Sequence, residues 1–126
     1  IFWMPEVVEA GTETDQLIDF TDWYATLLDV GNARLPRGYQ IDGISCVDTI
    51  LGDSSERTVA FAEHGKRYFL RDQRWKLYNN GDLYDVQAGP EESMPFGLKT
   101  DSRASSLARR RLSDQMRKMG LPQTIR

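Results

Sequence analysis

Three short strand patterns separated by turn signals lie between residues 64 and 85, and they constrain the fold of this chain more than any other feature. Each pattern is rich in aromatic and large aliphatic side chains, which pack well on the pleated surface of a sheet. A fourth pattern of the same kind precedes them. The four patterns cover 58–63, 67–71, 74–78 and 83–86. Because the intervals between them are short, the sequence predicts an antiparallel meander of four strands.

Two turn signals separate the last three patterns, Asp72-Gln73 and Asn80-Gly81. Asn-Gly is the strongest short hairpin signal, because a two-residue turn of type I′ needs a positive φ at both central residues. We therefore expect a hairpin of two residues, or slightly more, at each place.

Alternation along the strands divides their side chains between the two faces of the predicted sheet. One face would be apolar, with Tyr68, Leu70, Trp75, Leu77 and Leu83. The other face would hold Arg71, Lys76 and Tyr78. The apolar face needs a cover, and the segment 102–119 predicts a helix that can provide it. The apolar stripe of that helix is Ala104, Leu107, Ala108, Leu112, Met116 and Met119, followed by Gly120 and Pro122 as end signals.

The first part of the chain predicts a second helix over 19–31. Asp19 or Thr21 can cap it and Gly31 can end it. Its apolar face would carry Phe20, Trp23, Tyr24, Leu27 and Leu28. The following segment, 32–55, indicates a long connection, in which we expect one helical turn at 47–51.

Together these features predict an α+β fold, in which a small antiparallel four-stranded sheet is covered by a C-terminal helix. An apolar run at residues 1–4 is consistent with a buried strand whose partners lie upstream in a longer chain. We interpret that strand and the helix after it as the end of a larger α/β domain. The predicted boundary separates 1–52 from 53–126. Since the sequence opens on Ile1 rather than on Met, we expect a cut inside a larger protein.

The composition excludes several functional classes. The chain has 16 basic and 19 acidic residues and a net charge of −3, so it lacks the basic field of nucleic-acid-binding proteins. No apolar run approaches the length of about 18 residues that indicates a membrane span. Cys46 is the single cysteine, which rules out an internal disulfide and a multi-cysteine zinc site. The acidic residues do not form a calcium-binding loop pattern, so no metal ligand is predicted.

The candidate binding residues are His64, Lys66 and Arg67, which surround a predicted turn at Gly65. A turn that presents three cationic or ionisable side chains suits an anion such as sulfate or phosphate. The alternative is an ordinary turn beside a solvated strand face. A catalytic triad cannot be assembled from this sequence, because no serine or cysteine has a nucleophile-elbow context.

The order of several short motifs resembles the C-terminal portion of sulfatases. Asp15 to Asp29 resembles the stretch in which that family leaves a central strand and enters a helix. Leu35-Pro36, Asp42-Gly43-Ile44-Ser45 and Leu51-Gly52 resemble the connection that follows. Trp75-Lys76-Leu77-Tyr78, Leu83-Tyr84-Asp85 and Pro90-Glu91-Glu92 resemble the last strands and the acidic turn after them.

This resemblance implies the end of a sulfuric ester hydrolase of the arylsulfatase type, in the alkaline phosphatase superfamily. The family uses calcium and a formylglycine made from a cysteine in a Cys-x-Pro/Ala-x-Arg motif. Cys46 does not match that motif, because Asp48 and Ile50 occupy its last two defined positions. The resemblance places the calcium ligands and the catalytic groups upstream, so no catalytic residue is expected in this chain. Its small sheet would shape the substrate cleft, with His64, Lys66 and Arg67 facing a sulfated small molecule or glycan.

Two other functions stay open at this stage. One is a non-catalytic α+β module that binds a protein through the apolar side of helix 19–31. The other is the C-terminal part of a related phosphodiesterase or phosphonate hydrolase, because a shared fold does not separate sulfate from phosphate esters. The exposed strand edge and the amphipathic helix also predict that the isolated chain self-associates. The sulfatase family is often periplasmic, extracellular or lysosomal.

Overall fold

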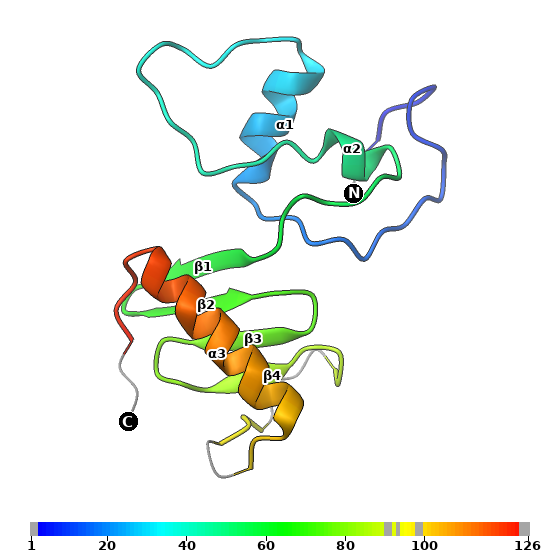
Figure 1. Cartoon of the computed structure of the whole chain (residues 1–126). Helices are drawn as coiled ribbons and strands as arrows, with labels where there is room; N and C mark the ends of the chain where they lie inside the picture. Colours follow the sequence, from blue (N-terminus) through cyan, green and yellow to red (C-terminus); the bar gives the residue numbers. More distant parts are fainter. Residues whose placement is uncertain (1–2, 90–91, 93, 98–99, 124–126) are drawn as a thin grey trace. The chain divides into compact units, whose positions relative to one another are not determined.

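The computed structural model describes residues 3–89, 92, 94–97 and 100–123. The chain divides into two compact units, Ile1–Thr58 and Val59–Arg126. The first unit contains helices α1 (Asp22–Val30) and α2 (Val47–Ile50). The second contains strands β1 (Ala60–His64), β2 (Arg67–Arg71), β3 (Trp75–Tyr78) and β4 (Leu83–Asp85), followed by helix α3 (Arg103–Lys118), as Figure 1 shows. Ser55 and Arg57 belong to the first unit and bond to Leu17 and Asp22 within it.

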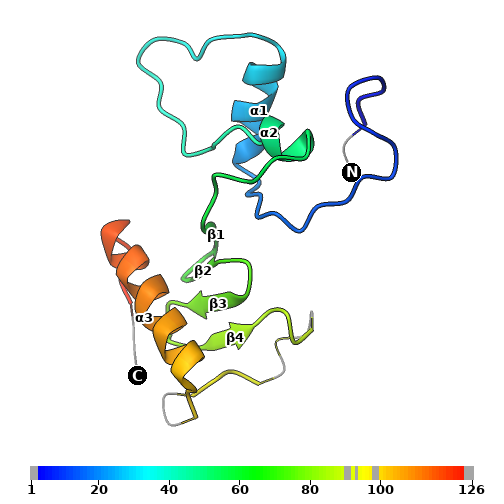
Figure 2. The ribbon, with the colours of Figure 1, turned by 45° about the vertical axis from the view of Figure 1, so that its right-hand side comes forward.

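The second unit confirms the predicted α+β fold and the meander. Its four strands form one sheet in the order β1-β2-β3-β4, and every neighbouring pair is antiparallel. Figure 2 shows α3 lying across one face of this sheet. The local sequence explains the simple topology, since short turns can join only neighbouring antiparallel strands.

Two of the three hairpin turns use a glycine in the left-handed region. Between β1 and β2, Gly65 has a φ of 61° and His64 pairs with Arg67, which makes a two-residue turn. Between β3 and β4, Gly81 has a φ of 92° and its N–H donates to the Tyr78 carbonyl at 3.0 Å. Asn80 is not among the described residues with positive φ, so this turn is not of type I′. It is the longer loop in which a turn is followed by a left-handed glycine.

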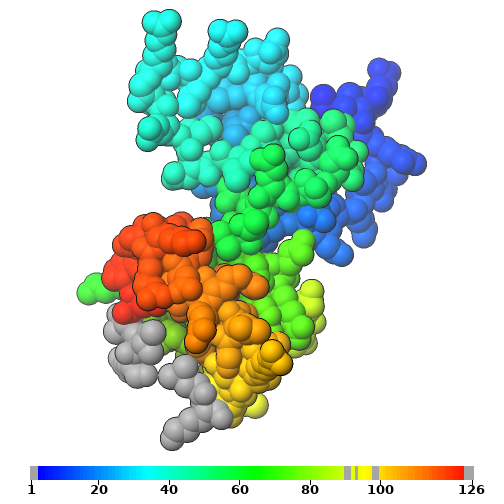
Figure 3. All heavy atoms as spheres, in the orientation of Figure 1, coloured from blue at the N-terminus to red at the C-terminus, as the bar shows by residue number. Residues whose placement is uncertain are grey.

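The core of the second unit lies between the sheet and α3. It contains eight buried residues, Tyr68, Leu70, Trp75, Leu77, Leu83, Ala108, Leu112 and Met116. The five from the sheet are those that alternation predicted for the apolar face. In the space-filling view of Figure 3, the side chains of α3, in orange, close over the green strands beneath them.

Helix α3 has a clear start and end. The Ser102 side chain accepts a hydrogen bond from the Ser105 N–H at 3.2 Å, which caps the first turn. Gly120 has a φ of 70°, and the Leu121 N–H donates to the Met116 carbonyl at 2.9 Å. This is a Schellman ending, in which a left-handed glycine lets the chain satisfy the last carbonyls of the helix.

The buried stripe of α3 is narrower than the sequence predicted. Ala108, Leu112 and Met116 are buried, but Leu107 is 58% exposed and Met119 is 45% exposed. Ser105 is buried instead. Its hydroxyl donates to the Ser102 carbonyl at 3.1 Å, so this small polar side chain is satisfied within the first turn of the helix. A helix that packs on a sheet buries only the residues that face the sheet, which explains the difference.

Arg109, on α3, has a structural role in the second unit. Its guanidinium pairs with Asp101 and donates to the Phe96 carbonyl at 2.6 Å and to the Gly81 carbonyl. The side chain thereby connects α3 to the turn between β3 and β4.

The first unit differs from the prediction in which side of α1 is buried. Asp22 and Thr26 are the buried residues of this helix. Three apolar residues are instead exposed, Phe20 by 89%, Leu27 by 64% and Tyr24 by 50%. The reason is a set of hydrogen bonds to Asp22 and Thr26, described below, which fix the rotation of the helix.

The predicted strand at residues 1–4 is not formed in its described half. Trp3 and Met4 have no strand conformation, and Trp3 is 84% exposed. A strand needs a hydrogen-bonded neighbour, and the described residues of the first unit form none. Ile1 and Phe2 lie outside the described residues. The single turn at 47–51 is confirmed as α2.

In the described parts of the chain, no helix has both the length and the apolar character needed to cross a bilayer.

Candidate functional site: the outer face of the sheet

The face of the sheet opposite α3, here called the outer face, carries cationic and aromatic side chains. Residues directly opposite each other in an antiparallel pair project to the same side. The register of the three pairs therefore groups these side chains together. The outer face comprises His64, Arg67, Phe69, Arg71, Lys76, Tyr78 and Tyr84.

Lys76 holds the central contacts of this face. Its Nζ lies 3.8 Å from the ring centroid of Phe69 and 5.0 Å from that of Tyr78. The same atom forms an ion pair with Oε1 of Glu92, and the Tyr78 hydroxyl donates to Oε2 of Glu92 at 2.8 Å. The guanidinium of Arg67 lies 4.3 Å from the Tyr78 ring centroid. Both cations are thus placed against aromatic rings, which favours them electrostatically.

The pKa values of this cluster favour its charged state. Burial opposes the charge of Lys76, but hydrogen bonds to Glu92 and Tyr78 outweigh it and raise the pKa of the ammonium. Burial likewise opposes the charge of Glu92, yet the bonds from Lys76 and Tyr78, with the charges of Lys76 and Arg67, lower the pKa of its carboxyl. Burial raises the pKa of the Tyr84 hydroxyl, as do the nearby charges of Asp82 and Glu92. The ion pair is therefore intact at neutral pH.

The three predicted binding residues lie together at one end of the outer face. His64 ends β1 and Arg67 begins β2, and these two form the last pair of the ladder. Lys66 lies in the turn between them, and its carbonyl accepts a bond from the side-chain amide of Asn79 at 3.0 Å. All three side chains are exposed. Their role in substrate binding stays a prediction.

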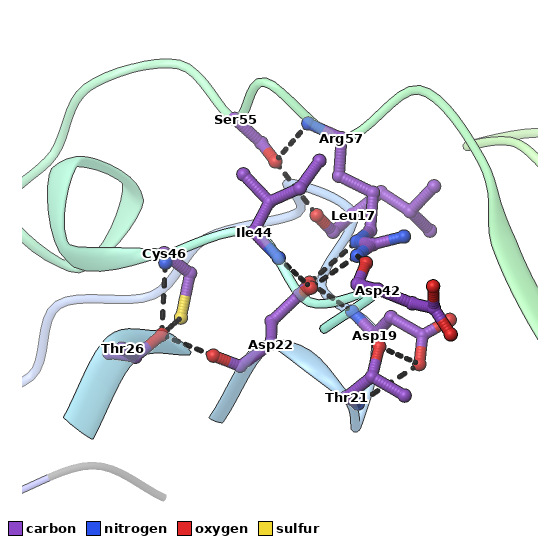
Figure 4. A network of polar contacts seen from close by, with 10 residues as sticks. All are labelled: Leu17, Asp19, Thr21, Asp22, Thr26, Asp42, Ile44, Cys46, Ser55 and Arg57. Atoms are coloured by element: carbon purple, nitrogen blue, oxygen red, sulfur yellow. Dashed lines mark hydrogen bonds and ion pairs between the residues drawn. The ribbon is translucent and has the colours of Figure 1, made fainter. Parts of the chain in front are cut away.

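A second polar cluster, in the first unit, organises structure. The Asp22 carboxylate accepts bonds from the backbone N–H groups of Asp19 at 2.8 Å and Ile44 at 2.9 Å, and from Arg57 Nε at 2.6 Å (Figure 4). Burial works to raise the pKa of Asp22, but these donors and the charge of Arg57 leave it lowered. Asp22 is 1% exposed, so the cluster fixes three segments of the unit and offers little surface to a ligand.

Thr26 and Cys46 extend that cluster, as Figure 4 also shows. The Thr26 hydroxyl donates to the Asp22 carbonyl at 2.7 Å and accepts from the Cys46 N–H at 3.0 Å. Cys46 Sγ lies 3.1 Å from the same hydroxyl, and Cys46 is 4% exposed. Cys46 therefore packs as a small buried residue in this cluster.

The described residues do not fit the cofactors that the sulfatase resemblance implies. Cys46 is buried against Thr26, so it does not fit a formylglycine that must meet a substrate. Within the described ranges there is also no group of three or more His, Cys, Asp or Glu side chains that could hold a calcium ion.

Sequence reasoning missed the centre of the outer face. Alternation placed Lys76 and Tyr78 on one side of the sheet, and extending it to Arg67 and Phe69 would have revealed the cluster. Glu92 could not be found in this way, because a loop brings it back to a lysine 16 residues earlier in the chain.

The comparisons with known proteins found similarity only among solved structures. No protein-family model and no curated protein matches this chain. A 2-O GAG sulfatase is 24% identical with a TM-score of 0.51, and the match covers 77% of this chain and 24% of that one. A protein solved with its substrate D-glucosamine-2-N,6-O-disulfate is 23% identical with a TM-score of 0.57. That match covers 77% of this chain and 23% of the other chain. A Bacteroides thetaiotaomicron protein provisionally assigned to the sulfatases is 26% identical, with coverage of 77% and 24%, but its TM-score is 0.48. The first two matches show a shared fold, and this chain spans about a quarter of their length.

Proposed function

We propose that this chain is the C-terminal part of a sulfatase, a hydrolase of sulfate esters, and that its outer face helps to shape the substrate cleft. The observation that carries the proposal is the fold, which this chain shares over 77% of its length with a 2-O GAG sulfatase. The ordered motifs of the sequence support the same family independently. Under this proposal the bond-breaking groups, the formylglycine and the calcium ion all belong to the rest of the protein.

The chemistry of the β1–β2 turn supports a role in binding a sulfated sugar. His64, Lys66 and Arg67 are exposed on a tight turn, and Arg67 is steadied by the Tyr78 ring. Sulfate oxygens accept hydrogen bonds from such groups, and a cation that is already positioned loses little freedom on binding. The neighbour solved with a sulfated glucosamine supports a substrate of this class.

Replacing Lys66 with alanine in the complete protein should raise KM for a sulfated glucosamine by about three- to tenfold, with kcat nearly unchanged. The reason is that one exposed charge-assisted contact to a sulfate is worth about 1 kcal/mol and is made equally in ground and transition states. Steady-state kinetics of the protein, expressed with a formylglycine-generating enzyme, would measure this.

Lys118→Ala is the matched control, because Lys118 is likewise an exposed lysine but belongs to α3 and not to the turn. Equal KM values for the Lys66 variant and the Lys118 variant would show that Lys66 does not contact the substrate.

The apolar side of α1 favours a second candidate, a module that binds a protein partner. Tyr24 and Leu27 on α1, and Phe20 just before it, are exposed although they are large and apolar. Exposed apolar groups of this kind commonly mark interaction surfaces. On this alternative, the complete protein would hydrolyse neither sulfate nor phosphate esters.

The same side of α1 predicts that the isolated 126-residue chain self-associates. The change Phe20→Asp with Leu27→Asp should shift it toward monomer, because a charge cannot be buried cheaply in an apolar contact. Sedimentation velocity over a concentration series measures the change. Tyr39→Asp is the control, since Tyr39 is a large residue that is 70% exposed and lies in the connection between α1 and α2. A wild-type chain that sediments as a monomer at every concentration would contradict this prediction.

A further inference from the structure

The geometry points to an oxyanion-binding site on the outer face, formed by Lys76, Tyr78 and Arg67 and filled in this structure by the carboxylate of Glu92. The ligand class is a sulfate group carried by a small molecule or sugar, so the inference rests on the proposed function and extends it. Glu92 then acts as an internal competitor that a sulfate must displace.

Two donors converge on the anionic group that fills the site. Lys76 binds Oε1 of the Glu92 carboxylate, while the Tyr78 hydroxyl binds Oε2 at 2.8 Å. The donors thus reach two separate oxygens of one anionic group. A sulfate presents pairs of oxygens in the same way, and charge-assisted bonds to it are equally strong.

Different degrees of burial allow an exchange of the anion. The Lys76 side chain is 16% exposed, and Tyr78 is 9% exposed. The Glu92 side chain is 31% exposed, so the acceptor lies nearer to solvent than its donors. Glu92 can therefore leave toward water while the donors stay in place.

Aromatic rings hold the cations in position when the carboxylate leaves. The Lys76 ammonium lies 3.8 Å from the Phe69 ring centroid, and Arg67 lies 4.3 Å from that of Tyr78. Without Glu92, the Lys76 ammonium, on a side chain that is only 16% exposed, would lose its ion-pair partner. Such an arrangement is unfavourable until another anion neutralises it.

Sulfate binding to the isolated chain tests this inference without requiring any catalytic activity. Sodium sulfate would be titrated at constant ionic strength against sodium chloride, and the amide signals of β3 would be followed by NMR. Glu92→Gln should bind sulfate about five- to tenfold more tightly than the wild type. In the wild type the Glu92 carboxylate occupies the site for most of the time and competes with sulfate, and the variant lacks that carboxylate. Glu92→Gln combined with Lys76→Met should lose this gain.

Two controls separate site formation from a change in net charge. Glu63→Gln removes the same charge from an exposed position on the opposite face of the sheet, and should leave sulfate affinity at the wild-type level. Glu92→Asp keeps the charge on a shorter side chain, and should give an intermediate affinity even if Glu92→Gln does not fold. The inference is overturned if the folded Glu92 variants bind sulfate no better than Glu63→Gln, or if Lys76→Met leaves the gain intact. Absence of esterase activity in the complete protein would count against the proposed function and would leave this binding result unaffected.

Discussion

Replacing Asp22 with alanine is expected to unfold the first unit while the second unit stays folded. The carboxylate is 1% exposed and accepts bonds from Arg57 and from two backbone N–H groups. Removing it takes the carboxylate partner away from a guanidinium whose side chain is 12% exposed and from the two backbone N–H groups. Breaking a buried ion pair on one side costs about 3–5 kcal/mol, which is comparable with the whole stability of a small unit.

Amide hydrogen exchange would measure this effect one residue at a time. The Ile44 and Cys46 amides, which bond to Asp22 and Thr26, should exchange about 100-fold faster or more, as a loss of at least about 3 kcal/mol implies. The Leu70 and Leu77 amides of the sheet should be unchanged. Asp53→Asn is the control, since Asp53 is an exposed carboxylate in the same unit. Equal protection of Ile44 in both variants would contradict the structural role of Asp22.

The same carboxylate predicts how the first unit responds to acid. The pKa of Asp22 is lowered in the folded chain from its ordinary value of 3.8. Its stabilising contribution is therefore complete above that value and is lost as the pH falls through the lower folded pKa. The first unit should lose protection below about pH 4, a change that the Asp22→Ala variant should not show.

Replacing Leu112 with alanine should destabilise the second unit by about 2–5 kcal/mol, the usual cost of this change at a filled core position. Leu112 is fully buried and lies in the cluster between α3 and the sheet. Urea denaturation followed by circular dichroism would show a lower midpoint with a similar slope.

Leu107→Ala provides the matched control for that prediction. Both leucines belong to the apolar stripe predicted from sequence, yet Leu107 is 58% exposed. Alanine has the higher helix propensity, so this variant should keep the wild-type midpoint. If the two substitutions had equal effects, the placement of α3 on the sheet would be wrong.

The fold of the second unit could be predicted because its signals are local. Period-two alternation, short turns and the stripe of α3 each concern residues near one another in sequence. The type of the Asn80-Gly81 turn could not be predicted in detail, because the backbone can use the glycine alone in the left-handed region. The pattern also overestimated the buried width of α3, since periodicity shows which residues share a side and not how far the sheet reaches beneath it.

The first unit was harder to predict because much of its apolar pattern is exposed and two polar residues of α1 are buried. Phe20, Tyr24 and Leu27 form a regular apolar side, which normally indicates the buried side of a helix. The partners of Asp22 lie far along the chain, at Ile44 and Arg57, and no local pattern reveals such bonds. In the candidate site, too, only the contacts between residues close in sequence could be predicted. His64, Lys66 and Arg67 were visible as neighbours in sequence, whereas the contact of Lys76 with Glu92 depends on how a loop folds back.

Sulfate release from D-glucosamine-2-N,6-O-disulfate is the measurement that tests the central proposal most directly. It would compare the isolated 126-residue chain with the complete protein, matured by a formylglycine-generating enzyme. Our account predicts release by the complete protein and none by the isolated chain. The account would be contradicted if the matured complete protein released sulfate neither from this sugar nor from an aryl sulfate. Cleavage of phosphate esters by that protein would then favour the related phosphodiesterase, and no cleavage at all would favour the binding module.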